Sequence, residues 1–579
     1  MLWHTALLCG AAIGTAYGQD SSSSSSSSAS TTASVVPTGT PVPGDYTGPL
    51  RPRAHFSPPQ GFKNDPNGLF VWNGTYHYYY QYNPTATVAG NQHWGHATTT
   101  DGYTWVNQPI ALFPPDNETF VFSGSAVVDT NNTSGLFPDQ NDGVVAIYTL
   151  ANYPGGVQGI QTQAIAYSRD GGYTFTPYEN NPVLDKNSTN FRDPKVVWHA
   201  PTQRWVMVVA LAADFVVSFY TSPNLIDWSF ASNFTRHGLL GIQYECPNLV
   251  ELPYRNPESF TTSSWLLFVS INPGAPLGGS IGQYFPGFFN GTHFQPMDSV
   301  TRIADFGKDN YAGQFFFASP ADPSISQNTT APSPNDLSSP FNNQLSIDWA
   351  SNWQYTNLLP TGPAEGWASI ATLPKETYLT TIPLVGTTLV RYPLNIPSQF
   401  SSVLFSNSSF TNSSAAISYA DLPSKALWFE ANVTGLTATT LRGQVNLTFT
   451  SSQSGESVRL GTNIGAEVWM TRHDTHGYNF VDNPFYTDAF SASGVYGREG
   501  EWRIAGVIDR SVLELYLNGG QQVGTMVFFP GRELDGVTIS VGGVAEGTEV
   551  AVGVWGLRDA WAGREADQEG QVTRKRDEL

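Results

Sequence analysis

Short apolar runs rich in aromatic and β-branched residues, separated by turn residues, recur along most of this chain and predict an all-β protein. Clear examples are residues 76–82, 144–150, 206–210 and 265–271. Such runs are typical of strands, and no long stretch shows the period of an amphipathic helix. Two hairpins, at residues 99–105 and 168–175, repeat an Asp-Gly turn before an aromatic strand. The repetition indicates β-propeller blades, although a large β-sandwich would show the same periodicity.

Changes in composition divide the chain, and its 579 residues are too many for one hydrophobic core. The second series of strands contains no helical pattern and suits a β-sandwich. We expect a signal peptide (1–18), a disordered Ser/Thr/Pro-rich linker (19–50), a catalytic propeller (51–385), a second linker (386–400), a sandwich (401–558) and a charged tail (559–579).

The first residues predict export, because residues 6–16 are mostly apolar and small residues surround Gly18. The expected location is therefore extracellular, and no later segment is apolar enough to span a membrane. The last four residues, Arg576 to Leu579, resemble an endoplasmic-reticulum retention signal with Arg at its first position, which we expect to be coincidental. Asn-x-Ser/Thr sequons predict N-glycosylation. They begin at Asn73, Asn117, Asn131, Asn132, Asn187, Asn233, Asn290, Asn328, Asn407, Asn412, Asn432 and Asn446.

Composition excludes several classes of function. The formal net charge is −20 and only 13% of residues are charged, which argues against nucleic acid or an anionic membrane as a partner. The sequence contains no Cys/His cluster and no glycine-rich phosphate loop, so we expect no metal and no cofactor. Cys246 is the one cysteine of the mature chain, and with no histidine motif beside it we expect a buried thiol.

Three short motifs carry the candidate chemistry, because each sets a carboxylate near a proline. They occupy residues 64–68, 191–194 and 243–247, with Asp65, Asp193 and Glu245 as the acids. A glycoside hydrolase needs two carboxylates, one as nucleophile and one as proton donor, whereas each motif alone could be an ordinary turn. The amides around Asp65 should favour its ionised form and lower its pKa. The apolar residues after Glu245 should favour a protonated acid.

Other side chains could complete a sugar site. Arg192 and Asp193 are adjacent, and a turn before Pro194 could aim both at one ligand, although a structural ion pair is the simpler interpretation. Aromatic side chains suit the apolar faces of sugars, although each is more often part of a core. The candidates are Trp94, Phe122, Trp349 and Trp353.

Taken with further motifs, these residues resemble glycoside hydrolase family 32, and within it the fungal and yeast invertases. The likeness runs from about residue 51 to 558. The further motifs lie at residues 81–84, 94–97, 122–125, 181–184, 270–276, 305–309, 349–355 and 508–514. The resemblance implies a five-bladed β-propeller with the active site at its axis, followed by a C-terminal β-sandwich. It also implies retention of configuration and suggests a homodimer formed through the sandwich.

The resemblance also implies roles for individual residues. Asp65 would be the nucleophile, Glu245 the acid/base, and Asp193 the transition-state stabiliser, helped by Arg192. The fructose pocket would be lined by Asn64, Gln81, Trp94, Phe122, Ser123 and Trp353. One position departs from the family, because Lys63 stands where a methionine is usual. A Lys63 side chain in the pocket would alter acceptor preference or lower the pKa of Asp65 further, whereas one in solvent would do little.

The activity implied is hydrolysis of sucrose through a covalent fructosyl-enzyme. Capture of the same intermediate by a sugar would make a fructosyltransferase that produces short fructo-oligosaccharides. Exo-hydrolysis of fructans such as inulin or levan and a non-catalytic sugar-binding propeller are further alternatives. A sialidase is a weaker one, because no arginine triad or tyrosine nucleophile accompanies the Asp-Gly hairpins.

Overall fold

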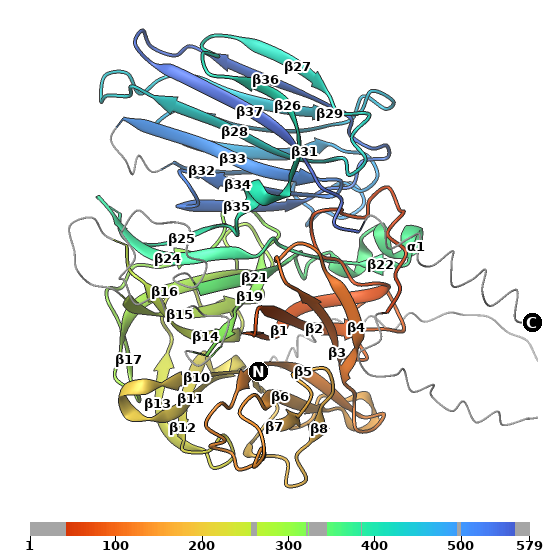
Figure 1. Cartoon of the computed structure of the whole chain (residues 1–579), viewed down its shortest axis with the longest axis vertical. Helices are drawn as coiled ribbons and strands as arrows, with labels where there is room; N and C mark the ends of the chain where they lie inside the picture. The colour runs from red at the N-terminus through yellow and green to blue at the C-terminus, as the bar shows by residue number, and fades with distance from the viewer. Residues whose placement is uncertain are drawn as a thin grey trace, which may run out of the picture.

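The chain folds into two β-rich domains that pack against each other in this computed structural model (Figure 1). The structure describes residues 42–255, 263–319, 322, 344–383, 385–494 and 500–561. Within these ranges the one α-helix is α1 (Thr361–Glu365), and no helix is long and apolar enough to cross a membrane. The predicted all-β class is thereby confirmed.

The first domain is a propeller of five antiparallel blades, each built from strands that follow one another in the chain (Figure 1). The first blade contains β1 (Gly61–Trp72), β2 (Thr75–Asn83), β3 (His93–Thr99) and β4 (Val106–Leu112). The second contains β5 (Thr119–Val128), β6 (Val144–Asn152), β7 (Gln161–Ser168), β8 (Thr176–Pro177) and β9 (Leu184–Ser188). The third contains β10 (Phe191–His199), β11 (Arg204–Leu211), β12 (Val216–Ser222) and β13 (Ser229–Thr235).

The last two blades complete the ring. The fourth contains β14 (Tyr244–Pro253), β15 (Ser263–Ile271), β16 (Ile281–Phe289), β17 (Phe294–Pro296) and β18 (Arg302–Ile303). The fifth contains β19 (Tyr311–Phe315), β21 (Gln344–Ala350), β23 (Ile370–Ala371), β24 (Lys375–Ile382) and β25 (Gly386–Pro393). Two short strands, β20 (Phe317–Ala318) and β22 (Trp367–Ala368), pair in parallel with β1. They tie the end of the propeller to its first blade.

The inner strand of every blade lies beside the inner strands of both neighbouring blades. In order around the ring these strands are β1, β5, β10, β14 and β19, and β19 returns to β1. Aromatic and β-branched residues fill the space between blades, as the apolar runs predict. In the first blade, for example, Tyr78 and Tyr80 of β2 pack with Phe56 and Trp105, all nearly inaccessible to solvent. The packed ring fixes the inner strands, which carry the three acidic motifs.

The second domain is a sandwich of two six-stranded antiparallel sheets. One sheet contains β26 (Phe400–Asn407), β37 (Glu549–Leu557), β28 (Ala426–Thr434), β33 (Glu501–Asp509), β34 (Val512–Leu517) and β35 (Gln522–Val527). The other contains β27 (Ser414–Ser418), β36 (Gly536–Gly542), β29 (Gln444–Thr450), β30 (Ser457–Asn463), β31 (Glu467–Asp474) and β32 (Ala489–Ser493). A single apolar cluster that includes Leu447, Leu460 and Trp502 fills the space between the sheets.

The segment boundaries differ from the expected ones at three places. Residues 386–393, expected to be linker, form β25 and pair along their whole length with β24. Their threonines suit an outer strand, and Pro393 lies at the end of the strand where no ladder donor is needed. Residues 42–50 and 559–561 also pack onto the fold, since Tyr46 stacks on Trp561 with ring centroids 3.7 Å apart.

Buried charges join the two domains. Asp509 and Glu514 of the sandwich accept hydrogen bonds from the two ring nitrogens of His55, each at 2.9 Å. Lys375 of the fifth blade lies 2.8 Å from the Glu514 carboxylate. All four side chains are inaccessible to solvent, so each charge is satisfied only while the domains stay together.

Candidate active site

A β-bulge interrupts each of the five inner strands where it passes the propeller axis. The bulges lie between Lys63 and Pro66, Phe122 and Gly124, Arg192 and Lys195, Glu245 and Asn248, and Tyr311 and Gln314. A bulge adds a residue to one strand and re-aims its side chains. Pro194 and Pro247 lie within two of these bulges and Pro66 borders a third, positions where the missing N–H costs little in ladder hydrogen bonding. This explains why each acidic motif contains a proline.

Asp65 lies in the β1 bulge and is almost fully buried. Its Oδ2 accepts a hydrogen bond of 2.8 Å from the hydroxyl of Ser123 in the second blade. Its Oδ1 has no hydrogen-bond partner among the described residues. Burial raises the pKa of Asp65 to about 6, against the lowering effect of the Ser123 hydrogen bond. The Asn64 amide lowers this pKa as expected, but the expected net lowering is wrong because loss of hydration outweighs the hydrogen bonds.

Asp193 lies across the site on β10 and has a left-handed backbone with φ of 65°. Its Oδ2 accepts a hydrogen bond of 2.9 Å from the backbone N–H of Cys246. The Cys246 thiol lies 3.6 Å from Asp65 Oδ2 and 3.7 Å from Asp193 Oδ2. Burial raises the pKa of Asp193 to about 7, and the charges of Glu245 and Asp65 act in the same direction. The three motifs therefore converge on one buried site.

Glu245 lies on β14, and two polar side chains from other strands contact its carboxylate. Arg192 donates from Nη2 to Glu245 Oε1 at 2.9 Å, and the Tyr311 hydroxyl donates to Oε2. Arg192 Nε also lies 4.0 Å from Asp193 Oδ2, so the bulge in β10 brings Arg192 and Asp193 to one site. The low-polarity surroundings expected for Glu245 are not what the fold provides, since a guanidinium and a phenol contact its carboxylate.

The other residues expected at the site lie around these acids at different depths. Asn64 and Ser123 are buried beside Asp65, whereas Phe122 and Trp353 are partly exposed.

Gln81 and Trp94 lie deeper, and they donate to the backbone carbonyls of Val121 and Phe122, both at 3.1 Å. In this geometry they support the second blade, and direct contact with a substrate stays a prediction. Trp349 is also fully buried and packs edge-on against Trp353.

Lys63 points neither into the pocket nor into solvent. Its side chain is fully buried, and Nζ donates a hydrogen bond of 2.8 Å to the hydroxyl of Tyr78. Burial lowers the pKa of Lys63 well below its ordinary value. The two outcomes considered from the sequence are thus replaced by a third, in which the lysine lies in the core of the first blade.

Side chains also link neighbouring inner strands around the axis. Ser125 of β5 accepts a hydrogen bond from the backbone N–H of Val196 on β10. Asn248 of β14 donates to the carbonyl of Gly313 on β19.

Gln314 closes this ring from β19. Its amide donates to the carbonyls of Pro66 and Gly124, both at 3.0 Å, and accepts from Leu69 at 3.1 Å. One buried side chain thus joins three inner strands beside the carboxylates.

Sequence reasoning missed four contributors to the site. They are Thr149, which accepts from the Asp193 N–H; Gln243, which accepts from Arg192; Cys246, expected only as a buried thiol; and Tyr311. Gln243 and Cys246 flank Glu245 in sequence and could have been found there, whereas Thr149 and Tyr311 reach the site only through blade packing. Among the described residues, no group of three or more His, Cys, Asp and Glu side chains is arranged to hold a metal ion.

Comparison with known families gives two matches in chain order. The sequence matches the N-terminal domain of glycosyl hydrolases family 32 over residues 55–393. It matches the C-terminal domain of the same family over residues 405–555. Together the matches cover most of the chain.

Individual relatives agree with these matches. The chain is 38% identical to an invertase of Schizosaccharomyces pombe, over 84% of this chain and 81% of that protein. It is 41% identical to an extracellular exo-inulinase of Meyerozyma guilliermondii, over 83% of this chain and 90% of that protein. The solved fructofuranosidase of Schwanniomyces occidentalis complexed with fructose aligns with a TM-score of 0.76 and 34% identity, over 89% of this chain and 99% of that one.

Proposed function

This chain belongs to glycosyl hydrolase family 32, and we propose that it is a secreted β-fructofuranosidase that hydrolyses sucrose to glucose and fructose. The observation that carries the proposal is the buried Asp65 carboxylate, with one oxygen held by Ser123 and the other unpaired. Glu245 and Asp193 complete the site within reach of Arg192 and Cys246. The names of the invertase and fructofuranosidase relatives support sucrose as the substrate.

In the first step Asp65 attacks the anomeric carbon of the fructosyl unit while Glu245 protonates the bridging oxygen. Glucose leaves and a covalent fructosyl-enzyme remains. Asp193 binds fructose hydroxyls and stabilises the positive charge that develops on the ring, with its carboxylate held by the N–H of Cys246. Left-handed backbone at Asp193 and Cys246 supports these roles, since strained residues gather where geometry must be exact.

In the second step Glu245 removes a proton from water, which attacks the same carbon from the side that glucose left. The ester bond to Asp65 breaks and fructose is released with retained configuration. Arg192 and Tyr311 keep the Glu245 carboxylate in place through both steps. A sugar that replaced the water would be extended by one fructosyl unit, which is the fructosyltransferase alternative.

Export and assembly complete the proposal. The apolar stretch before Gly18 supports secretion, as does the name of the extracellular exo-inulinase relative. From the family resemblance we also propose a homodimer formed through the sandwich, which light scattering on the purified protein would test.

Replacement of the nucleophile is the direct test of this mechanism. Asp65→Ala should lower kcat/KM for sucrose by at least about 1,000-fold, because no covalent intermediate can form. Glu179→Ala, which removes an exposed carboxylate of the second blade, should leave the rate unchanged. Initial rates and circular dichroism of both variants provide the measurement. A folded Asp65→Ala protein with wild-type activity would contradict the assignment.

A second measurement separates the substrate and acceptor alternatives. Products from sucrose at low and high concentration, and from inulin, would be separated by chromatography. Equal glucose and fructose at both sucrose concentrations indicate hydrolysis, whereas excess glucose with new trisaccharides indicates fructosyl transfer. Faster release of fructose from inulin than from sucrose would favour exo-inulinase activity, which the Meyerozyma guilliermondii relative makes the second candidate.

A further inference from the structure

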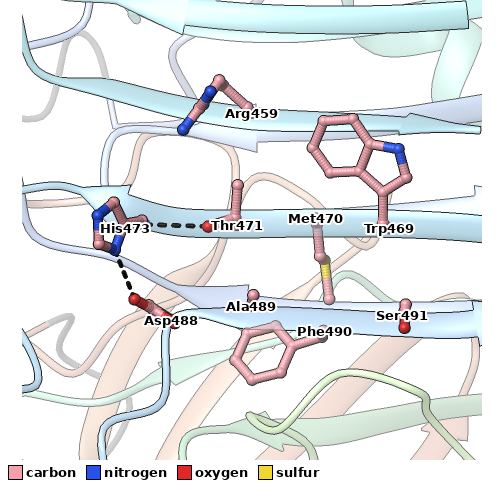
Figure 2. Close-up of a pocket in the computed structure, with 9 residues that line it drawn as sticks. All are labelled: Arg459, Trp469, Met470, Thr471, His473, Asp488, Ala489, Phe490 and Ser491. Atoms are coloured by element: carbon pink, nitrogen blue, oxygen red, sulfur yellow. Dashed lines mark hydrogen bonds and ion pairs between the residues drawn. The ribbon is translucent and has the colours of Figure 1, made fainter.

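A groove of about 390 Å³ lies on the second sheet of the sandwich, in a different domain from the three carboxylates (Figure 2). Its volume is within the range of roughly 300–1,000 Å³ that small-ligand sites occupy. Met470 and Phe490 point inward to the sandwich core. The other lining residues come from strands β30, β31 and β32 and from the position just before β32; they are Arg459, Trp469, Thr471, His473, Asp488, Ala489 and Ser491.

Polar side chains and the partly exposed indole of Trp469 line this groove. Arg459 lies 3.0 Å from Asp474, and both side chains are roughly two-fifths exposed. His473 lies 2.6 Å from Asp488. Figure 2 shows the indole of Trp469 leaning toward the strand that carries Arg459. Partly exposed hydrogen-bonding groups beside an indole can bind hydroxyls on one side and the apolar C–H face of a sugar on the other.

Strand register places a glycosylation sequon at one end of the groove. Asn446 of β29 pairs with Gly461 of β30, and Gly461 pairs with Trp469 of β31. Asn446 and Thr448 begin and end the sequon, and both alternate with the inward residues Val445, Leu447 and Phe449. They therefore lie on the outward face with Trp469.

Gly461 lets the asparagine and the tryptophan approach each other. A β-carbon at this position would lie 2.5 Å from Asn446 Oδ1 and 2.8 Å from Trp469 Cζ2. Both side chains thus lean over the space that a larger residue would fill. The Asn446 amide makes no hydrogen bond with any described residue, so its nitrogen is available for modification.

We propose that Asn446 is N-glycosylated and that its first N-acetylglucosamine stacks on the indole of Trp469. The following sugars run along the groove past Arg459 and Thr471. The covalent link keeps the glycan at high effective concentration over the groove, so weak stacking suffices to hold it. The inference rests on the proposed secretion and not on the enzymatic activity, which the sucrose assay tests separately on the same preparation.

Another sequon offers a matched control within the sandwich. Asn432 lies on β28 of the other sheet, and its strand neighbours are Arg503 and Ala551. Neither neighbour is aromatic, so a glycan on Asn432 would have no aromatic side chain directly opposite it.

The test uses the full chain secreted from a glycosylating eukaryotic host. Glycopeptide mass spectrometry should find Asn446 occupied. An endoglycosidase that leaves the first sugar should preserve the melting temperature, whereas Asn446→Gln should lower it by about 2–4 °C. Trp469→Ala should lower the melting temperature more in the wild-type background than in Asn446→Gln. The effects of Asn432→Gln and Trp469→Ala on the melting temperature should be additive.

Radical footprinting gives a readout that needs no substitution at Trp469. Oxidation of the peptide that contains Trp469 should be slower in the glycosylated protein and in the endoglycosidase-trimmed protein than in Asn446→Gln. An unmodified Asn446 in the secreted protein would overturn the proposal. So would an occupied Asn446 whose removal changes neither Trp469 oxidation nor the effect of Trp469→Ala.

Discussion

At the scale of single residues, the site contains two carboxylates, Asp65 and Asp193, that burial and the charges of neighbouring carboxylates push toward protonation. The pKa of Asp65 rises to about 6 and that of Asp193 to about 7, in both cases chiefly through burial. Ser123, Arg192 and the Cys246 N–H oppose this shift by stabilising the ionised forms. Few hydrogen bonds therefore favour the ionised form of Asp65, the proposed nucleophile, and the loss of each should have a measurable effect on the pH profile.

Ser123→Ala removes the hydroxyl that donates to Asp65. The pKa of Asp65 should rise, so the acidic limb of kcat/KM for sucrose should move to higher pH by about one unit, because a hydrogen bond to a charged group contributes about 1.5–3 kcal/mol. Steady-state rates across the acidic range provide the measurement. Ser123→Thr keeps a hydroxyl and should hold the wild-type profile. An acidic limb that stays in place in Ser123→Ala would argue against Asp65 as the titrating group.

Lys63→Met should stabilise the protein by about 1 kcal/mol at acidic pH and leave sucrose turnover nearly unchanged. A buried cation with one hydroxyl partner is costly, and methionine fills a similar volume. The folded pKa of Lys63 lies below its unfolded value, so the cost is largest where the folded lysine must be protonated and fades as pH rises. Chemical denaturation at pH 5 and pH 9 tests both sign and trend. A destabilised variant would mean that Lys63 is paired better than its hydrogen bond to Tyr78 indicates.

At the scale of elements, five bulges and a ring of side-chain hydrogen bonds set the geometry of the axis. Strands alone would point adjacent residues to opposite faces. The bulges bring Arg192 and Asp193 to one site, and the prolines fit because bulged positions donate no ladder hydrogen bond. Links such as Asn248 to Gly313 then hold neighbouring bulges in register. The site is therefore a property of the closed ring of blades.

Gln314→Leu should destabilise the propeller by roughly 3–6 kcal/mol, because it removes three hydrogen bonds to buried backbone groups. It should also lower kcat, since Asp65 lies beside the freed carbonyl of Pro66. Denaturant unfolding followed by tryptophan fluorescence measures the first effect. Gln295→Leu, an exposed glutamine of β17, should change stability by less than about 0.5 kcal/mol. Equal effects of the two substitutions would contradict the ring of links.

At the scale of the whole molecule, buried charges between the two domains make the stability of the fold depend on pH. Hydrogen bonds to Asp509 and Glu514 outweigh burial and raise the pKa of His55 to about 8. Lys375 and His55 likewise lower the pKa of Glu514 to about 2. The stability that His55 contributes is fully present below about pH 6.5 and is lost as pH rises through 8. The stability that Glu514 contributes is fully present above about pH 4.5 and is lost as pH falls toward 2.

Stability should therefore fall between pH 5 and pH 8. The raised pKa values of Asp65 and Asp193 act in the same direction as that of His55, because the folded state holds protons that the unfolded chain releases. Asp65→Asn removes one of these groups, so it should raise the melting temperature at pH 8 and change it little at pH 4. Calorimetry across this range is the measurement. If the melting temperature of Asp65→Asn fell with pH as steeply as that of the wild type, ionisation of Asp65 would not destabilise the folded protein.

The sequence by itself determined the all-β class, the order of propeller and sandwich, and the acids that meet at one site. Alternation reports which face of a strand is buried, and the acid–proline motifs mark the bulges locally. Sequence reasoning placed residues 386–393 in a linker because threonine and proline are common in both loops and outer strands.

Only the tertiary structure decided what each acid faces. Tyr311 reaches Glu245 from another blade, the Cys246 thiol lies between Asp65 and Asp193, and Lys63 turns into the core. The pKa of Asp65 rises instead of falling for the same reason. The pattern along a strand predicts whether a side chain points inward or outward. The burial of the acids and their partners across the axis arise only when five blades close into a ring.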